Sequence, residues 1–315
     1  MANPTIYYPM AGPPSAGGQH VNVAHVRALA GAGHDAKLLY IPGSSEALQF
    51  EVDAPMIRLA DDMRFSDRDI VVLPEPWRGP IEAFGRTPAR KVVHCQNPFY
   101  LFHGFDDIRS LKAQGYRRML TCSEYTSQMV RRYGYDGEVF TVRPAISPEF
   151  GAHVAPPTLQ IAYMPRKRAV ETVYLQGLFK SLYPQFANIP WVKVDGMSRG
   201  QCAEVLQKSA IFASFSWYEG LGLPPLEAMS CGALVVGLHG FGGLDYANEH
   251  NGYWSQEGDY FGFAEQLANA ISDFQAGGHA ARREAGFKSA AVYSQARFEA
   301  ALLEAWQAIL EGERL

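Results

Sequence analysis

The 315-residue sequence has few cysteines and no long apolar run, and each absence excludes a class of protein. The four cysteines, Cys95, Cys122, Cys202 and Cys231, form no CxxC pair, so we expect free thiols rather than disulfides or a zinc site. No stretch approaches the ~18 consecutive apolar residues of a membrane span. The first twelve residues, MANPTIYYPMAG, lack the basic-then-apolar order of a secretion signal. We therefore expect a cytoplasmic protein without a membrane span, and contact with a membrane surface stays open.

Two further binding signatures are missing. The net charge is only −4, and the basic cluster RKR at 166–168 is too short to indicate a nucleic-acid partner. The glycine-rich stretch GPPSAGGQ at 12–19 has P-loop spacing, but Gly18 and Gln19 stand where lysine and serine or threonine are required. It does not fit G-x-G-x-x-G either, so neither a P-loop nor a dinucleotide fingerprint is expected.

The organisation of the chain indicates an α/β fold. The length suits about two domains of ~150 residues. Short apolar runs alternate with helical patterns, which favours parallel sheets covered on both faces. The strand candidates are TIYY (5–8), AKLLYI (36–41), DIVVLPE (69–75), KVVHCQN (91–97), RMLTCS (118–123), EVFTVRP (138–144), LQIAYMP (159–165), WVKVD (191–195), IFASFSW (211–217) and ALVVGL (233–238).

A proline-rich segment divides this pattern. PAISPEFGAHVAPPT at 144–158 contains four prolines and little periodicity, which is typical of a linker between domains. We therefore expect one doubly wound domain over residues 1–150 and a second over 151–295. Ser123 and Ser198 are placed to cap helices, and after Tyr253 the pattern predicts helix to the end.

The stretch EGLGLPPLEAMSCG at 219–232 has the composition of a binding loop that enters a helix. Its glycines let the backbone approach a ligand closely, and its prolines suit the first turn of a helix. The spacing predicts a helix over 224–231 that ends at Gly232. The amides of Leu221, Gly222 and Leu223 and the positive end of the helix would then favour a phosphate.

Two carboxylates flank this helix start. Glu227 would lie one turn into the helix, where it can accept hydrogen bonds from the two hydroxyls of a ribose. Glu219 would reach a group on the other side of the phosphate. Either glutamate alone is more simply read as a solvated residue or as a partner of the helix dipole. Together, a ribose carboxylate and a second polyol carboxylate with phosphates between them indicate a nucleotide sugar.

At this point the sequence resembles a known family. SFSWYEGLGLPPLEAMSCGALVVG is similar to the signature of retaining, nucleotide-sugar-dependent glycosyltransferases with the GT-B fold, the large family four or group 1 type. The resemblance implies two Rossmann-like domains facing a central cleft. Residues 1–150 would bind the acceptor and residues 151–295 the donor, while 296–315 resemble a helix that crosses back to the first domain.

The resemblance also implies roles for individual residues. Glu227 would hold the donor ribose and Glu219 the transferred sugar, and His94 would lie near that sugar. Base contacts would come from the loop that contains Met197. Further donor contacts would come from the backbone of Gly17, Gly18, Gly220, Leu221, Gly222 and Leu223.

The family commonly offers an arginine and, about five residues later, a lysine to the diphosphate, but here Arg166, Lys167 and Arg168 are contiguous. We choose Arg166 and Lys167 as the cations that stabilise the leaving diphosphate; a solvated basic turn is the alternative. No DxD motif follows a strand, so we expect no metal and no cofactor beyond the sugar donor.

The resemblance leaves several alternatives open. The alternative for His94 is a core position. Aromatic residues at 99, 100, 102 and 105 would either line a saccharide acceptor site or form a hydrophobic cluster under a loop. The expected reaction is transfer of a hexose from UDP or GDP to a hydroxyl of a saccharide or glycoconjugate. A GT-B sugar-nucleotide epimerase, a phosphorylase-like enzyme and a catalytically silent nucleotide-sugar-binding subunit are the rivals, and the oligomeric state is not determined.

Overall fold

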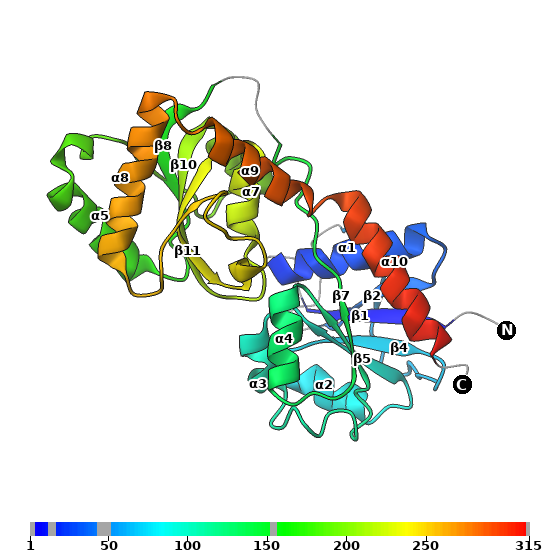
Figure 1. Ribbon diagram of the computed structural model, residues 1–315. Helices are drawn as coiled ribbons and strands as arrows, with labels where there is room; N and C mark the ends of the chain where they lie inside the picture. The colour runs from blue at the N-terminus through cyan, green and yellow to red at the C-terminus, as the bar shows by residue number, and fades with distance from the viewer. Residues whose placement is uncertain (1–3, 12–16, 43–51, 152–155, 313–315) are drawn as a thin grey trace. The chain divides into compact units, whose positions relative to one another are not determined.

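The protein is represented by a computed structural model (Figure 1). It describes residues 4–11, 17–42, 52–151 and 156–312.

The chain divides into two compact units. The first contains Met1–Pro144 together with Phe298–Leu315, and the second is Ala145–Arg297. The division falls at Pro144, the first residue of the proline-rich segment, rather than at residue 150. The last residues group with the first unit, and the family role of this helix as a crossover stays a prediction.

The first unit is built on a seven-stranded sheet in which every described strand pair is parallel. Its order is β3-β2-β1-β4-β5-β6-β7, which is the 3-2-1-4-5-6 order of doubly wound nucleotide-binding sheets with β7 added at one edge. The strands are β1 (Ile6–Met10), β2 (Ala36–Tyr40), β3 (Met56–Arg58), β4 (Ile70–Pro74), β5 (Arg90–Cys95), β6 (Arg118–Thr121) and β7 (Glu138–Thr141).

Helices from both ends of the chain pack on this sheet. Trp306 is fully buried, with its ring 6.5 Å from the ring of Tyr8 on β1, and Phe298 lies 5.4 Å from the ring of His25. The C-terminal helix therefore completes the core of the first unit. The helices of this unit are α1 (Gly17–Gly31), α2 (Arg78–Gly85), α3 (Leu101–Gly104), α4 (Glu124–Arg132) and α10 (Gln295–Glu311).

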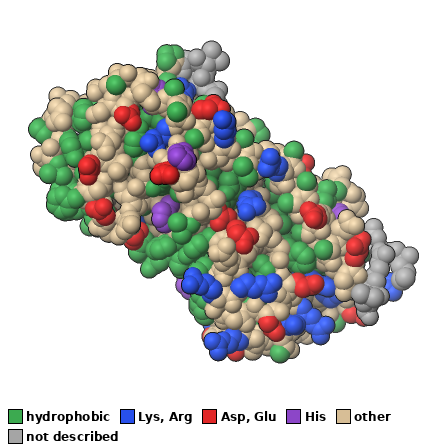
Figure 2. Space-filling model, in the orientation of Figure 1, with side chains coloured by type: hydrophobic (Ala, Val, Ile, Leu, Met, Phe, Trp, Pro, Cys, Tyr) green, Lys and Arg blue, Asp and Glu red, His purple; other side chains and the backbone are tan. Residues whose placement is uncertain are grey.

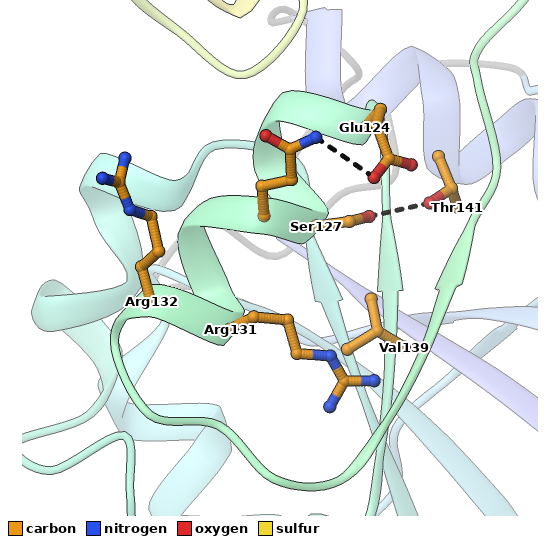
Figure 3. Close-up of a pocket in the computed structure, with 7 residues that line it drawn as sticks. Glu124, Ser127, Arg131, Arg132, Val139 and Thr141 are labelled. Atoms are coloured by element: carbon orange, nitrogen blue, oxygen red, sulfur yellow. Dashed lines mark hydrogen bonds between the residues drawn. The ribbon is translucent and has the colours of Figure 1, made fainter.

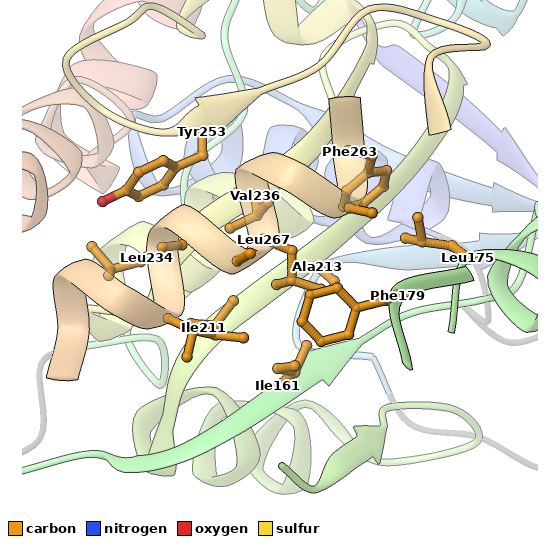
Figure 4. Close-up of a cluster of buried hydrophobic side chains, with 14 of the residues drawn as sticks. Ile161, Leu175, Phe179, Ile211, Ala213, Leu234, Val236, Tyr253, Phe263 and Leu267 are labelled. Carbon is orange, nitrogen blue, oxygen red and sulfur yellow. The ribbon is translucent and has the colours of Figure 1, made fainter. Parts of the chain in front are cut away.

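The second unit has a five-stranded parallel sheet in the order β12-β11-β10-β8-β9. Counted from β8, this is the 2-1-3-4-5 order of flavodoxin-like sheets, which changes direction between β8 and β10. Ile161, Ala213 and Val236 from three of the strands meet Phe179 and Phe263 in the core (Figure 4). The elements are β8 (Thr158–Tyr163), α5 (Ala169–Leu182), β9 (Trp191–Lys193), α6 (Arg199–Lys208), β10 (Ser209–Glu219), α7 (Leu223–Cys231), β11 (Leu234–Phe241), β12 (Tyr253–Trp254), α8 (Tyr260–Ala276) and α9 (Ala280–Ala291).

The observed elements follow the sequence patterns closely. Each of the strand candidates forms a strand, and the side chains of Ser123 and Ser198 cap α4 and α6. Strands β3 and β12 were not foreseen, because three and two residues are too few to show an alternating pattern. The expectation of continuous helix after Tyr253 was wrong in detail: α8 begins at Tyr260 and ends at Ala276, before Gly277 with φ 75°, and two more helices follow.

Gly237 on β11 lies in a tightly packed part of the second unit. Its φ is 116°, which favours glycine, and a Cβ added there would lie 2.2 Å from Cζ of Phe263 and 2.6 Å from the carbonyl oxygen of Ser214. Gly277, by contrast, has a positive φ but no heavy atom within 4 Å of an added Cβ. The two glycines thus separate the effect of backbone strain from that of crowding.

We predict that Gly237→Ala lowers the free energy of unfolding by at least about 3 kcal/mol, because it combines left-handed strain with overpacking. Gly277→Ala is the matched control and should lose only about 1–2 kcal/mol. Urea unfolding of the two variants and the wild type measures the difference. Equal losses in the two variants would show that α8 does not pack against β11 as described.

Candidate functional site

The candidate site lies where the strand order of the second sheet reverses, between β8 and β10. In open parallel sheets, ligands bind beyond the carboxyl ends of the strands at this switch point. Here the carboxyl ends belong to β8, which ends at Tyr163, and β10, which ends at Glu219. The basic segment 166–168 follows β8, so topology brings it to the end of β10.

Lys167 and Glu219 meet at this edge. The Nζ atom of Lys167 lies 2.8 Å from Oε1 of Glu219 and donates to the carbonyl oxygens of Trp217 at 3.1 Å and Tyr218 at 3.4 Å. Both charged side chains are only about a quarter exposed, at 22% and 25%. Two residues expected to act on the same donor are therefore in direct contact.

The three contiguous cations occupy different environments. Arg168 is 3% exposed, with its guanidinium 3.9 Å above the ring of Trp217 and Nη2 2.6 Å from the carboxylate of Glu257. Its charge is therefore engaged within the unit. Arg166 is exposed and acts electrostatically on Asp195, which follows β9. The choice of Arg166 and Lys167 as diphosphate cations stays a prediction, and the position of Arg168 agrees with it.

A local backbone distortion orients Glu219. The pairing of β10 with β11 shifts register between Ser216 and Glu219, and Tyr218 within the shift has φ 45°. Within the described ranges, the only other non-glycine residue with positive φ is Phe241 at the end of β11, and its ring lies 5.8 Å from that of Tyr218 at 15°. Such strain persists where the surroundings enforce it, and it collects at functional sites.

Helix α7 starts beside this pair. It runs over Leu223–Cys231 after Gly222 at φ 83° and ends at Gly232 with φ 87°, so the helix expected over 224–231 is confirmed to within one residue. Pro224 and Pro225 occupy its first turn and carry no N–H. The four N–H positions without an intrahelical partner run from Gly222 to Pro225, so only Gly222 and Leu223 supply amide donors there.

Glu227 lies one turn into α7, in a buried position. It is 8% exposed, and burial is the main cause that raises its pKa to about 7. Arg199, whose Nη2 is 3.9 Å from Oε1 of Glu227, lowers this pKa, and Glu149 raises it. Arg199 was not foreseen, although it directly follows the capping Ser198.

The loop before α6 contains the residue predicted to lie near the base. Met197 is 36% exposed, and Gly196 before it has φ 65°. Ser198, the predicted cap, forms a capping box with Gln201, so this loop ends in a defined helix start. The role of Met197 stays a prediction.

The first unit holds the remaining candidates. Gly17 and Gly18 open α1, while residues 12–16 of the same glycine-rich stretch lie outside the described residues. The carbonyl oxygen of Gly18 accepts a hydrogen bond of 3.0 Å from Gln96, and a Cβ added at Gly18 would lie 3.1 Å from that side chain. Gly18 thus allows close approach of α1 to the end of β5.

His94 at the end of β5 is a buried, neutral residue. It is 1% exposed, and burial lowers its pKa to about 3. Nδ1 lies 2.8 Å from Oδ1 of Asn22, and the ring lies 4.6 Å from that of His25. The alternative of a core histidine fits this burial, and a contact with the transferred sugar stays a prediction.

Comparison with known proteins identifies the family. The family profile described as "Glycosyl transferases group 1" matches residues 193–285. An alpha-1,6-glucosyltransferase of Actinobacillus pleuropneumoniae serotype 7 is 32% identical over 277 residues, which are 85% of this chain and 84% of that protein. The chain belongs to the group 1 glycosyltransferases.

Solved structures extend the likeness over both units. Sucrose-phosphate synthase from Thermosynechococcus elongatus matches with a TM-score of 0.72 and 14% identity, covering 98% of this chain and 100% of the other. HepE of Anabaena in complex with UDP-glucose matches with a TM-score of 0.68 and 12% identity, covering 96% and 99%. At these identities the likeness concerns the fold. This glycosyltransferase therefore has the GT-B fold that its sequence resembled.

The aromatic residues at 99–105 of the glycosyltransferase lie in different surroundings. Phe105 is buried against Tyr116 in the first core, whereas Phe102 is half-exposed against Tyr133. Tyr100 stacks on His103 instead. The ring of Phe99 lies 6.4 Å from the ring of Tyr125, and an acceptor role for these aromatic residues stays a prediction.

A polar hollow of about 500 Å³ lies elsewhere on the first unit, between α4 and β7. Figure 3 shows Arg131 lying toward β7 and Arg132 pointing away from it, while the hydroxyls of Ser127 and Thr141 are 2.7 Å apart. None of the residues predicted for the donor site lines this hollow.

Charge and metal-binding groups are dispersed in the described parts of the glycosyltransferase. On the face shown in Figure 2, acidic and basic side chains are interspersed. Within the described ranges, no three His, Cys, Asp or Glu side chains gather to share a metal ion, and metal independence stays a prediction. No helix in that part of the chain is both long and apolar enough to cross a bilayer.

The raised pKa of Glu227 predicts a pH-dependent difference in stability between wild type and Glu227→Gln. The unfolded chain releases this proton near pH 4.5 and the folded chain near pH 7, so the folded state binds more protons between these values. As pH rises from 4.5 to 7, the wild type should lose roughly 3 kcal/mol relative to the variant. Urea unfolding of both proteins at pH 5 and pH 8 measures this change, and parallel pH profiles would contradict the burial of this carboxylate.

Proposed function

We propose that this enzyme transfers a hexose from a nucleoside-diphosphate sugar to a saccharide hydroxyl, with retained anomeric configuration and without a metal ion. UDP-glucose is the first donor to test, because the matched relative is named as a glucosyltransferase and the fold neighbour HepE was solved with UDP-glucose. The observation that carries the proposal is the arrangement around α7. A Lys167–Glu219 ion pair and the buried Glu227 flank a helix start that is rich in glycine and proline.

Each part of this arrangement has a task in the proposed reaction. The amides at the start of α7 and the cations Arg166 and Lys167 bind the diphosphate and stabilise the charge that it gains on departure. Glu227 accepts hydrogen bonds from the ribose hydroxyls. Glu219, held by Lys167 in the free enzyme, accepts hydrogen bonds from the hydroxyls of the transferred sugar.

The bond changes balance without a protein nucleophile. The bond from the anomeric carbon to the diphosphate oxygen breaks, and a bond to the acceptor oxygen forms on the same face of the sugar. The acceptor proton passes to the departing phosphate. The protein then contributes orientation and charge stabilisation.

We predict that one of UDP, GDP, ADP and TDP binds the wild type in EDTA, with UDP as the expected ligand. Glu227→Ala should weaken that binding roughly ten- to a hundredfold, because a charged partner of the ribose is lost. Glu284→Ala on α9, which removes an exposed glutamate paired with Lys288, is the control and should bind as wild type does. Calorimetric titration, repeated with magnesium, measures these affinities. Binding that needs magnesium would refute metal independence, and an unchanged Glu227→Ala affinity would refute the ribose role.

The stereochemistry is a separate prediction. With UDP-α-glucose and a saccharide acceptor, the product should carry an α-linked glucose, as read from the anomeric proton coupling in NMR spectra. A β-linked product would overturn the front-face mechanism. Tight nucleotide binding with no transfer to any of a panel of saccharides would instead favour the silent binding subunit.

A further inference from the structure

Tyr246 is a buried tyrosine that contacts the start of α7 from a distant part of the chain. It follows a short 3₁₀ turn, Gly242–Asp245, that comes after β11. It is 7% exposed, with its ring 6.2 Å from the rings of both Trp254 and Tyr293. Its hydroxyl donates a hydrogen bond of 2.7 Å to the carbonyl oxygen of Gly222. Burial also raises the pKa of Tyr246 well above its usual value, so the hydroxyl stays a donor.

This hydrogen bond acts on one particular peptide group. The peptide bond is planar and trans, so the carbonyl of Gly222 and the N–H of Leu223 point in opposite directions. A hydroxyl that holds the carbonyl therefore also holds the direction of the N–H. Gly222 has φ 83° and no side chain to fix its rotation, which makes an outside restraint effective.

The restrained N–H is one of few that α7 can offer. The first four N–H groups of a helix have no partner within the helix, but Pro224 and Pro225 remove two of them here. No side chain caps this helix start. The N–H of Leu223 is therefore half of the donor set that the helix provides, and its direction matters correspondingly.

The turn that contains Gly242 and Gly243 packs closely against the loop before α7. A Cβ added at Gly243 would lie 3.2 Å from the hydroxyl of Tyr246, and one at Gly242 would lie 2.5 Å from the carbonyl oxygen of Glu219. A Cβ at Gly222 would lie 3.3 Å from the same hydroxyl. Glycines on both segments thus allow the tyrosine to reach the loop between Glu219 and α7.

The backbone of Tyr246 is held in place by Asn251. Asn251, 2% exposed, donates through Nδ2 to the carbonyl oxygen of Tyr246 at 2.6 Å and to Oγ of Ser289 on α9 at 2.8 Å. Its Oδ1 accepts from the indole N–H of Trp254 at 3.0 Å. These bonds connect Tyr246 to α9 and β12, so its hydroxyl is a fixed point relative to the sheet.

We propose that Tyr246 is a positioning residue of the donor site: its hydroxyl holds the Gly222–Leu223 peptide group so that the N–H of Leu223 points at the donor diphosphate. This inference rests on the proposed nucleotide-sugar function. Tyr246 touches no donor atom and acts through the backbone alone.

The test compares two tyrosines that each lose only a hydroxyl. Tyr246→Phe keeps the packed ring and should weaken UDP binding about five- to tenfold in calorimetry with EDTA. Tyr253→Phe is the control, because its hydroxyl donates to Asp273 on α8 at 2.5 Å rather than to the peptide groups before α7. It should bind UDP within about twofold of wild type. Thermal unfolding of both variants separates lost stability from lost affinity. If the two variants shift the melting temperature by similar amounts but only Tyr246→Phe loses UDP affinity, Tyr246 has a positioning role.

A second variant removes the inferred donor directly. Leu223→Pro deletes the N–H at the first helical position, where proline is tolerated. It should weaken UDP binding, and adding Tyr246→Phe to it should cause no further loss, because both changes remove the same interaction. Independent, additive losses would overturn the inference. Unchanged UDP affinity in Leu223→Pro would also overturn it, even if Tyr246→Phe did not fold.

The outcomes also separate this inference from the proposed function. If the wild type binds UDP and Tyr246→Phe binds it equally well, the positioning role fails while the donor site stands. If the wild type binds none of UDP, GDP, ADP and TDP, both fail together.

Discussion

The parallel pairing of β8 with β10 is the constraint on which the site depends. Because all described strands of the second sheet run in one direction, the segments that follow β8 and β10 emerge at the same edge. The change in strand order between these two strands leaves that edge open to a ligand. Lys167 and Glu219 are far apart in sequence, yet their charged atoms lie 2.8 Å apart there.

The start of α7 adds a second level of organisation at this edge. Gly222 in a left-handed conformation turns the chain into the helix, and the two prolines make the helix begin without sacrificing any internal hydrogen bond. One turn later, Glu227 is removed from water, which disfavours its charged form. Arg199 lowers the pKa of Glu227 and so favours its charged form. The protonation of this carboxylate therefore depends on the cations and hydroxyls next to it.

The first unit illustrates how burial limits function assigned from a motif. His94 stands where the family resemblance places a sugar-contacting residue, but its ring is enclosed with His25 and bonded to Asn22. At neutral pH its imidazole is uncharged, because burial disfavours the protonated form. Any contact that it makes with a sugar would therefore be that of a neutral hydrogen-bonding group.

The sequence by itself determined all the strands except β3 and β12, a division within the proline-rich segment 144–158, the caps at Ser123 and Ser198, and the helix that ends before Gly232. These features depend on local properties: apolar periodicity, proline and glycine geometry, and hydrogen bonds between near neighbours. Only the tertiary structure decided that Arg168 binds Glu257 and packs on Trp217. It also decided that Arg199 and Tyr246 lie next to α7. Those contacts join segments far apart in the chain, and their partners are set by how helices and strands pack rather than by spacing along the sequence.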